Sequence, residues 1–357
     1  MSHADFRWGL IGPGAIARRF AEAVQRLPGA RLVAVAGRDG ARSRAFADRW
    51  AGAATVSAPV SAPDTAPVAA MPTVPALLAR DDLDAVYIAT PHAAHAQAVQ
   101  ACLQAGLPVL CEKPLVPTLA QAQPLVALAR ERGVFLMEAL WSRFLPLYDD
   151  IGTWLRRGDI GALRAVHSSF AFRLGFDPAH RCFAPALAGG ALLDIGIYNV
   201  ALARWALAQT LGSCPPLQTV HAHGVLAPTG VDQRVSAQLV YEGGAVVQFF
   251  CAFDTEGDNS LHLLGERGSI VVPQAFWQGT HATLVRQDGH TRSVERPFEI
   301  NGFEGEIREA MRCVRAGLVE SPGMPHAESL ALVETLDRLR AAVGVRYPFE
   351  DGLTGTA

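Results

Sequence analysis

The sequence is poor in cysteine, and its cysteines fall into no recognisable pattern. They lie far apart, without a Cys-x-x-Cys pair, at Cys102, Cys111, Cys182, Cys214, Cys251 and Cys313. This spacing indicates neither a disulfide framework nor a zinc site. We therefore expect buried or half-buried thiols.

The sequence also lacks a basic tract. Its formal net charge is -3 at pH 7, and lysine and arginine are spread along the chain. This distribution favours neither nucleic acid nor an anionic membrane as a partner. We expect small-molecule partners.

Long hydrophobic runs are missing as well. No run approaches the length needed to span a bilayer, and the first expected strand starts within about ten residues of Met1, which leaves no room for a signal peptide. These features predict a cytoplasmic protein.

With 357 residues, the chain exceeds the size at which one core usually suffices, so we expect two domains. Over residues 1–138, strand candidates are mostly separated by helical patterns, and they fall at Trp8 to Ile11, Leu32 to Ala36, Ala85 to Ala89, Pro108 to Cys111 and Val134 to Met137. Such alternation implies an α/β fold with a doubly wound parallel sheet and ligands at the carboxyl ends of its strands.

The pattern changes after Glu138. Period-two runs follow at Ala165 to Phe172, Val220 to Leu226, Val235 to Tyr241, Ala245 to Phe253, Ser269 to Val272 and Thr283 to Arg286. Turn residues at 242–244 and 287–290 predict two hairpins. Residues 139–357 are thus predicted to form an α+β domain for substrate binding and dimerisation, with a large, mostly antiparallel open sheet.

Helical patterns near Ala191 to Leu207, Phe303 to Ala316 and Ala327 to Val343 are expected to cover one face of this sheet. An uncovered sheet face is commonly an oligomer interface, so we expect a homodimer through the open face.

Two segments interrupt these patterns. Residues 51–75 are rich in Ala and Pro and predict a surface excursion, since closely spaced prolines block regular helix and central strand. Pro124 lies inside the helical pattern from Leu119 to Arg132, so that helix is expected to begin late or to kink.

A glycine motif follows the first strand. Trp8-Gly9-Leu10-Ile11 runs into Gly12-Pro13-Gly14-Ala15-Ile16-Ala17. In a dinucleotide site the first glycine makes the turn, the second admits the pyrophosphate, and a small third residue lets helix and strand pack closely. An ordinary strand-to-helix turn would look similar, but the surrounding alternation favours a dinucleotide-binding Rossmann domain.

Leu110-Cys111-Glu112-Lys113-Pro114 ends another strand of that domain. The proline restricts the backbone of the lysine before it to an extended form. Lys113 is therefore a candidate catalytic group at the carboxyl end of the sheet.

Asp194 and Tyr198 lie four residues apart in the apolar helical segment that follows Gly189-Gly190. That spacing places them on one helix face, where a cleft would supply the polar environment that they need. A capping aspartate and a tyrosine at a core edge would give the same pattern.

The end of the second strand bears on the choice of cofactor. NAD sites usually place an acidic residue there, whereas NADP sites place arginine nearby. Here Gly37 replaces the acid, Arg38 follows it, and Arg42 lies one turn into the next helix. These residues predict NADP, with NAD as the alternative if Asp39 turns inward.

These motifs together resemble one family, the glucose-fructose oxidoreductase and inositol dehydrogenase group known as Gfo/Idh/MocA. Three further stretches are similar to the branch with dimeric dihydrodiol dehydrogenase and NADP-dependent D-xylose dehydrogenase: TPHAAH at 90–95, MEALWSRF at 137–144 and SPGMP at 321–325. Tyr198 also favours this branch, because many other members carry histidine there.

The resemblance implies hydride transfer between NADP and a sugar, secondary alcohol or trans-dihydrodiol, with Tyr198 as general acid and base. A tyrosine has an ordinary pKa of about 10, so a nearby cation such as Lys113 is needed to favour the phenolate. Asp194 would orient Lys113 or the substrate. The cofactor site is expected to comprise Gly12, Pro13, Gly14, Ala15, Ile16, Gly37, Arg38, Arg42, Thr90, Pro91, His92, His95, Glu112 and Lys113.

A zinc pair at His92 and His95 lacks a third ligand of suitable spacing, so we expect no metal. The expected substrate contacts are aromatic residues and one arginine, namely Trp141, Arg143, Phe144 and Trp277, and Phe276 lies beside them. Two other functions fit the same fold: a non-catalytic dinucleotide sensor, and a sugar oxidoreductase that retains its cofactor tightly.

Overall fold

The computed structural model describes residues 5–50 and 67–350. Within them the chain forms two compact units, and neither is continuous in sequence. The first contains Met1–Val116, Gln121–Trp141 and Glu299–Ser329, and the second contains Pro117–Ala120, Ser142–Phe298 and Leu330–Ala357.

The first unit is built on a parallel sheet of six strands within the described residues, in the order β3-β2-β1-β4-β5-β6. Because the order reverses between β1 and β4, the carboxyl ends of these two strands lie at a topological switch point, where doubly wound sheets bind ligands. The strands are β1 (Phe6–Ile11), β2 (Ala30–Ala36), β3 (Ala69–Ala70), β4 (Ala85–Ile88), β5 (Val109–Glu112) and β6 (Leu136–Ala139).

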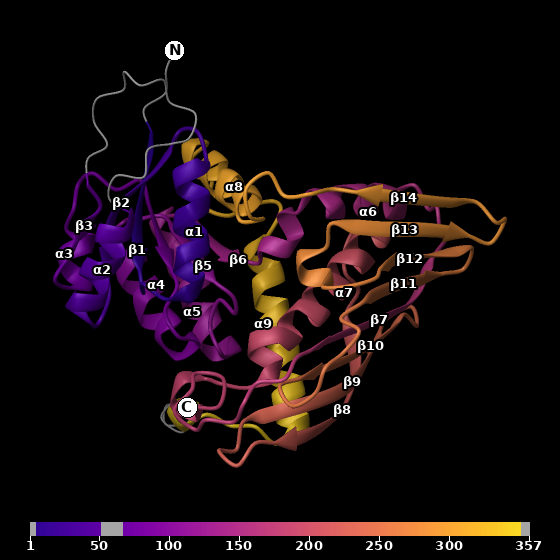
Figure 1. Ribbon diagram of the computed structural model, residues 1–357. Helices are drawn as coiled ribbons and strands as arrows, with labels where there is room; N and C mark the ends of the chain where they lie inside the picture. The colour runs from indigo at the N-terminus through magenta and orange to yellow at the C-terminus, as the bar shows by residue number, and fades with distance from the viewer. Residues whose placement is uncertain (1–4, 51–66, 351–357) are drawn as a thin grey trace. The chain divides into compact units, whose positions relative to one another are not determined.

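Helices cover this parallel sheet, as Figure 1 shows. They are α1 (Ala15–Arg26), α2 (Gly40–Trp50), α3 (Val74–Leu78), α4 (His95–Gln104), α5 (Leu119–Arg132) and α8 (Glu304–Arg315). Strand residues such as Trp8, Leu10 and Val86 are fully buried, as expected for strands with both faces covered.

The helix with an internal proline and the Ala/Pro-rich segment were the two irregular stretches expected from the sequence. The helix α5 does not begin late: it begins at Leu119 and contains Pro124. Most of the Ala/Pro-rich segment lies outside the described residues, and the part within them contributes β3 and the start of α3, where the Thr73 hydroxyl accepts the Ala76 N–H at 3.2 Å.

The second unit contains a mixed sheet of eight described strands in the order β14-β13-β12-β11-β7-β10-β9-β8. Only β7 and β10 pair in parallel among them. The strands are β7 (Leu163–Ala171), β8 (Leu217–Leu226), β9 (Asp232–Tyr241), β10 (Val246–Ala252), β11 (Leu261–Gly265), β12 (Gly268–Val272), β13 (His281–Arg286) and β14 (Thr291–Glu295). The fold class predicted from the sequence is confirmed for both sheets.

The two predicted hairpins are also present. Gly244 donates its N–H to the Tyr241 carbonyl oxygen at 3.0 Å, and this turn joins β9 to β10. Gly243 and Gly244 have φ angles of 86° and 83°, which glycine adopts without strain. Residues 287–290 connect β13 to β14.

Helices pack against one face of the mixed sheet (Figure 1). They are α6 (Pro146–Arg156), which contacts β13 and β14, α7 (Ile197–Leu211), which contacts β7, and α9 (His326–Val343). A Cβ on Gly224 of β8 would lie 2.8 Å from Val343 of α9, so that strand and helix are in close contact. Side chains on the opposite face, among them His167, His221 and Gln248, are exposed.

The segment Pro185–Leu211 corrects one expectation. It is long and apolar enough to cross a membrane by length and composition, although no such run was expected. In its most apolar window 89% of the residues are buried inside the protein, as in an apolar core helix.

Candidate active site

The turn after β1 has the shape that a dinucleotide requires. Gly12 adopts φ +93°, and a Cβ there would lie 2.8 Å from backbone atoms of Ala89 and Thr90. Only glycine fits such an approach without strain. Gly14 begins α1 without a side-chain cap, so the first amides of α1 remain available to a pyrophosphate, and Ala17 is fully buried in the small third position.

The end of β2 shows what Asp39 does. Its Oδ1 accepts the N–H groups of Ala41 and Arg42 at 2.9 and 3.1 Å, so Asp39 caps the N-terminus of α2. Arg38 and Arg42 are exposed. Gly37 is required here by packing, since a Cβ on it would lie 2.8 Å from Pro13.

The loop after β4 contains two histidines with different surroundings. His95 is fully buried, with Nδ1 at 2.8 Å from the Pro114 carbonyl oxygen and Nε2 at 2.9 Å from the Thr90 carbonyl oxygen. Burial lowers the pKa of His95, and the two carbonyl contacts oppose that shift. His95 therefore ties the end of β4 to the loop after β5. The His92 ring lies 5.8 Å from it.

The last residue of β5 is held from two sides. Glu112 is buried, its Oε1 accepts the Tyr87 hydroxyl at 2.5 Å, and its Oε2 accepts the backbone N–H of Lys113 at 3.2 Å. Lys113 is half-buried, and its peptide bond to Pro114 is cis. The predicted cofactor residues of the first unit therefore gather at the carboxyl ends of β1, β2, β4 and β5.

Buried carboxyl groups surround this end of the sheet. Glu306 of α8 is fully buried, and its pKa is raised well above the ordinary value by burial first and by the charge of Glu112 second. Glu138 of β6 accepts the Leu115 N–H at 2.9 Å through Oε1. Glu306 gives no sequence signal for this site, because it lies in a helix almost 200 residues from Glu112.

In the second unit, Asp194 lies beside an arginine that the sequence analysis missed. Arg181 donates to both carboxylate oxygens of Asp194, at 2.9 and 3.2 Å. The aspartate side chain is 8% exposed and the arginine side chain 50% exposed. A lone arginine in an irregular loop gives no sequence signal of such a pair.

The helix that carries Asp194 and Tyr198 begins in an unexpected form. Leu192–Gly196 is π-helical, and the α-helix α7 starts only at Ile197. A π turn inserts one residue, often at functional sites, so the spacing of Asp194 and Tyr198 is not that of a regular α-helix. Gly196 packs tightly there, since a Cβ on it would lie 3.1 Å from the Cys251 sulfur.

Aromatic rings lie next to Tyr198. Phe170 of β7 lies 5.9 Å from the Tyr198 ring and stacks on Trp277 at 3.4 Å between ring centroids. Trp277 and Tyr198 therefore both contact Phe170 and belong to one aromatic cluster. Trp141 packs instead on Phe303 and under the guanidinium of Arg19 in the first unit. Arg143 and Phe144 are half-buried.

Among the residues that the structure describes, no group of three or more His, Cys, Asp or Glu is arranged to hold a metal ion. Five of the six cysteines are buried and Cys214 is half-buried, as expected.

Comparisons with known proteins cover almost the whole chain. A model described as "Oxidoreductase family, NAD-binding Rossmann fold" matches residues 6–140, and one for the "GFO/IDH/MocA C-terminal domain" matches residues 148–271. Trans-1,2-dihydrobenzene-1,2-diol dehydrogenase of Mus musculus is 36% identical over 352 residues, which is 96% of this chain and 98% of that protein. The Homo sapiens protein of the same name is 33% identical over 349 residues, with the same coverage.

Solved structures agree with the fold. A 3-ketoreductase from Actinomadura kijaniata, in complex with NADP and TDP-benzene, has a TM-score of 0.79 at 29% identity and covers 95% of this chain and 98% of its own. Aldose-aldose oxidoreductase from Caulobacter crescentus has a TM-score of 0.80 at 23% identity over the same shares of the two chains, which shows the fold alone.

The Rossmann unit and the family matches together define an NAD(P)-binding oxidoreductase. More particularly, the chain belongs to the Gfo/Idh/MocA family. The resemblance identified from its sequence motifs is thereby confirmed.

Proposed function

We propose that the protein is an NADP-dependent dehydrogenase that acts on a CH–OH group of a sugar, a secondary alcohol or a trans-dihydrodiol. The observation that carries the choice of cofactor is the position of Asp39. Its Oδ1 already accepts the Ala41 and Arg42 amides as the cap of α2, and two exposed arginines beside it remain for a 2′-phosphate. The 3-ketoreductase relative solved with NADP supports the same choice.

The turn at Gly12 fits this cofactor. A dinucleotide needs close approach to a backbone without side chains, and the cramped surroundings of the Gly12 Cα provide that surface. Gly12 through Ile16 would hold the pyrophosphate, and Arg38 and Arg42 the 2′-phosphate. When bound, NADP supplies the acceptor or donor of the hydride.

The proton in this reaction is assigned to Tyr198. In the oxidation direction its phenolate takes the hydroxyl proton of the substrate while the carbon gives up its hydride, so a carbonyl group forms. The ammonium of Lys113 favours the phenolate and hydrogen-bonds the substrate oxygen. Asp194 orients Lys113 or the substrate, and the two hydrogen bonds from Arg181 hold the Asp194 carboxylate in place.

Replacing Tyr198 tests the assignment. Tyr198→Phe keeps the ring against Phe170 and removes only the hydroxyl, so the variant should bind NADPH normally and lose about 10²- to 10⁴-fold in kcat. Retained turnover would refute the role. Tight NADPH binding by the wild-type protein, without turnover of aldoses, inositols or dihydrodiols, would favour a sensor instead.

Replacing the two arginines tests the cofactor. Arg38→Ala and Arg42→Ala should each lower kcat/KM for NADP about tenfold and leave kcat/KM for NAD unchanged, because only NADP carries the 2′-phosphate. Arg44→Ala is a matched control, since Arg44 is an exposed arginine of the same helix. A wild-type preference for NAD would overturn the proposal.

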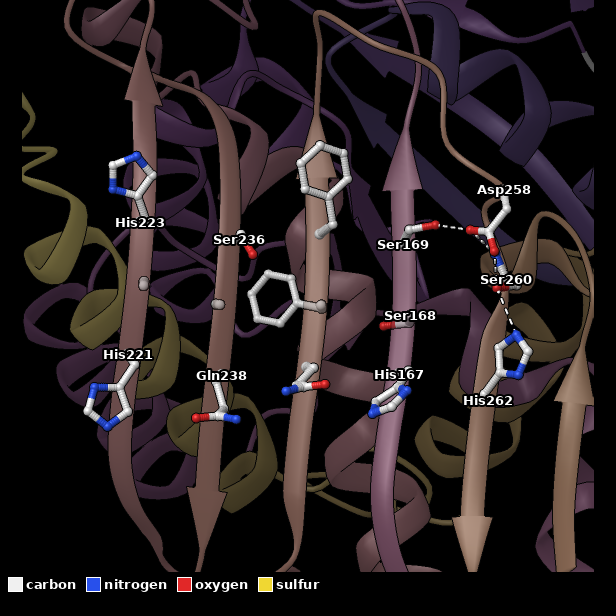
Figure 2. Close-up of a pocket in the computed structure, with 15 residues that line it drawn as sticks. His167, Ser168, Ser169, His221, His223, Ser236, Gln238, Asp258, Ser260 and His262 are labelled. Atoms are coloured by element: carbon white, nitrogen blue, oxygen red, sulfur yellow. Dashed lines mark hydrogen bonds between the residues drawn. The ribbon is translucent and has the colours of Figure 1, made fainter.

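We also propose that the open face of the mixed sheet pairs with a second copy of this chain. Side chains from neighbouring strands stand on that face around an open groove of about 830 Å³. Figure 2 shows His221 of β8, Gln238 of β9 and His167 of β7 in one row across the sheet, with β10 between the last two, and His223 further along β8. Asp258 accepts from Ser169 and, at 2.8 Å, from Ser260.

Such a wide polar face suits an interface rich in hydrogen bonds. Light scattering at micromolar concentration should give twice the mass of 38.0 kDa. A monomer would count against the dimer.

A further inference from the structure

The helix that carries Asp194 and Tyr198 has no cap from its own sequence. Ala191 stands at its N-cap position and provides no side-chain hydrogen bond. The first amides of a helix need acceptors, above all when they are buried. In this protein the acceptor comes from a strand 40 residues further along the chain.

That acceptor is Asp232, the first residue of β9. It is fully buried, and its Oδ2 accepts the Leu192 N–H at 2.6 Å. Its Oδ1 has no hydrogen-bond partner among the described residues, and a Cβ on Gly190 would clash with it. Gly190 adopts φ +121°, so both the conformation and the space at this turn depend on glycine.

The other side of the same turn is held by Tyr347. Its hydroxyl donates to the Gly189 carbonyl oxygen at 2.6 Å, and its ring is fully buried. The guanidinium of Arg340 lies 4.7 Å from that ring, and it bonds Asp337 and Glu350 at 2.6 Å each. The C-terminal part of the chain therefore fixes Tyr347 in place.

The turn is also crowded by the loop before it. A Cβ on Gly189 would lie 2.7 Å from the Cys182 carbonyl oxygen, and Gly190 donates its N–H to that same oxygen at 2.9 Å. Cys182 directly follows Arg181, the partner of Asp194. A displacement of the turn would thus move both members of that pair.

We propose that Asp232 and Tyr347 are positioning residues of the reaction, which clamp the Gly189–Gly190 turn and thereby set the place of Asp194 and Tyr198. The inference rests on the proposed function, because Tyr198 must be the proton-transfer group for its placement to matter. Neither residue touches the substrate. Misplacing a reacting group by about 1 Å is enough to slow catalysis about 100-fold.

The pKa of Asp232 also differs from that of an ordinary aspartate. Burial raises its pKa to about 7, against the amides of Leu192 and Ala191 and the positive charge of Arg340. The other titratable groups around it are Tyr347 and Cys251, whose own pKa values are raised by burial first and by Asp232 second.

The test compares Asp232→Ala with Asp232→Asn. The alanine variant loses the acceptor, so its kcat should fall about tenfold or more with KM for NADP unchanged, and amide hydrogen exchange should speed up in the peptide covering residues 189–198. The asparagine variant keeps an oxygen for Leu192, so it should restore most of kcat and of the protection. Tyr347→Phe should show the same two changes at about threefold in kcat.

Asp288→Asn is the control, since Asp288 is an exposed aspartate in the turn between β13 and β14. Wild-type kcat and exchange in Asp232→Ala would overturn the proposal, and so would an asparagine variant as impaired as the alanine one. If Asp232→Ala does not fold, the asparagine and Tyr347→Phe variants still decide. Hydrogen exchange also separates this proposal from the proposed function, because it reports on the turn even if Tyr198→Phe remains active.

Discussion

Two helix beginnings in this protein differ in how their first amides are satisfied. At α1 the turn through Gly12 and Gly14 offers no side-chain acceptor, and the amides face the carboxyl ends of the strands. At the helix that begins with Leu192, the buried carboxylate of Asp232 takes the first amide. The first arrangement leaves its amides without a side-chain acceptor, whereas in the second a buried carboxylate occupies the first amide.

A third helix beginning provides the reference for both. Asp39 caps α2 from the position directly before it, which is the ordinary local solution. The three helix beginnings thus differ in whether the acceptor for the first amides is absent, comes from the preceding residue, or comes from a distant strand.

The largest expected effect concerns Asp232, the buried cap of the helix that begins with Leu192. The pKa of Asp232 rises from an ordinary 3.8 to about 7 in the fold, so the folded protein binds this proton more tightly than the unfolded chain. Its ionisation therefore costs stability that grows as pH rises from about 4 to about 7, up to about 4 kcal/mol. The stability of Asp232→Asn relative to wild type should increase over that range.

Urea unfolding of both proteins at pH 5, 6, 7 and 8 measures this difference. Asp288→Asn supplies the control, because its carboxylate is exposed. Parallel stability curves for wild type and Asp232→Asn would contradict the prediction.

A second prediction places a side chain in the turn before α1, where the first amides have no side-chain acceptor. Gly12→Ala places a Cβ 2.8 Å from the backbone of Ala89 and forces a side chain into φ +93°. NADPH affinity should fall about 100-fold, which corresponds to about 3 kcal/mol, when measured by fluorescence titration.

Gly40→Ala is the matched control for Gly12→Ala. A Cβ at Gly40 meets nothing within 4 Å, and the residue lies at the start of α2. If the two variants bind NADPH equally well, the turn at Gly12 does not bind the pyrophosphate of the cofactor.

The smallest expected effect concerns α2, which has an ordinary local cap. Asp39→Ala removes the cap of α2 and should lower the free energy of unfolding by about 1 kcal/mol. The ratio of kcat/KM for NADP to that for NAD should stay the same, because the carboxylate is engaged by α2. Asp48→Ala, at an exposed position in the same helix, should change neither quantity, and an altered cofactor ratio in Asp39→Ala would show that Asp39 reaches the ribose.

Much of the fold could be predicted from periodicity. The strand and helix alternation before Glu138 and the period-two runs after it predicted both sheets, and the turn residues at 242–244 predicted a hairpin. The π turn at Leu192–Gly196 could not be predicted, because the apolar pattern of that segment is the one a regular helix has; the tight packing of Gly196 against Cys251 of β10 is likewise visible only in the fold. The apolar length of Pro185–Leu211 was underestimated; 89% of the residues in its most apolar window are buried.

The sequence by itself determined what is local in this protein: the order of its elements, the glycine turn at α1, the arginines after β2 and the aspartate that caps α2. Each depends on residues a few positions apart, which local backbone geometry places together. The tertiary structure decided the partners of Asp194, Glu112 and Leu192. Arg181, Tyr87 and Asp232 bond them across 13, 25 and 40 residues of sequence, because burial brings these segments together and buried polar groups require partners.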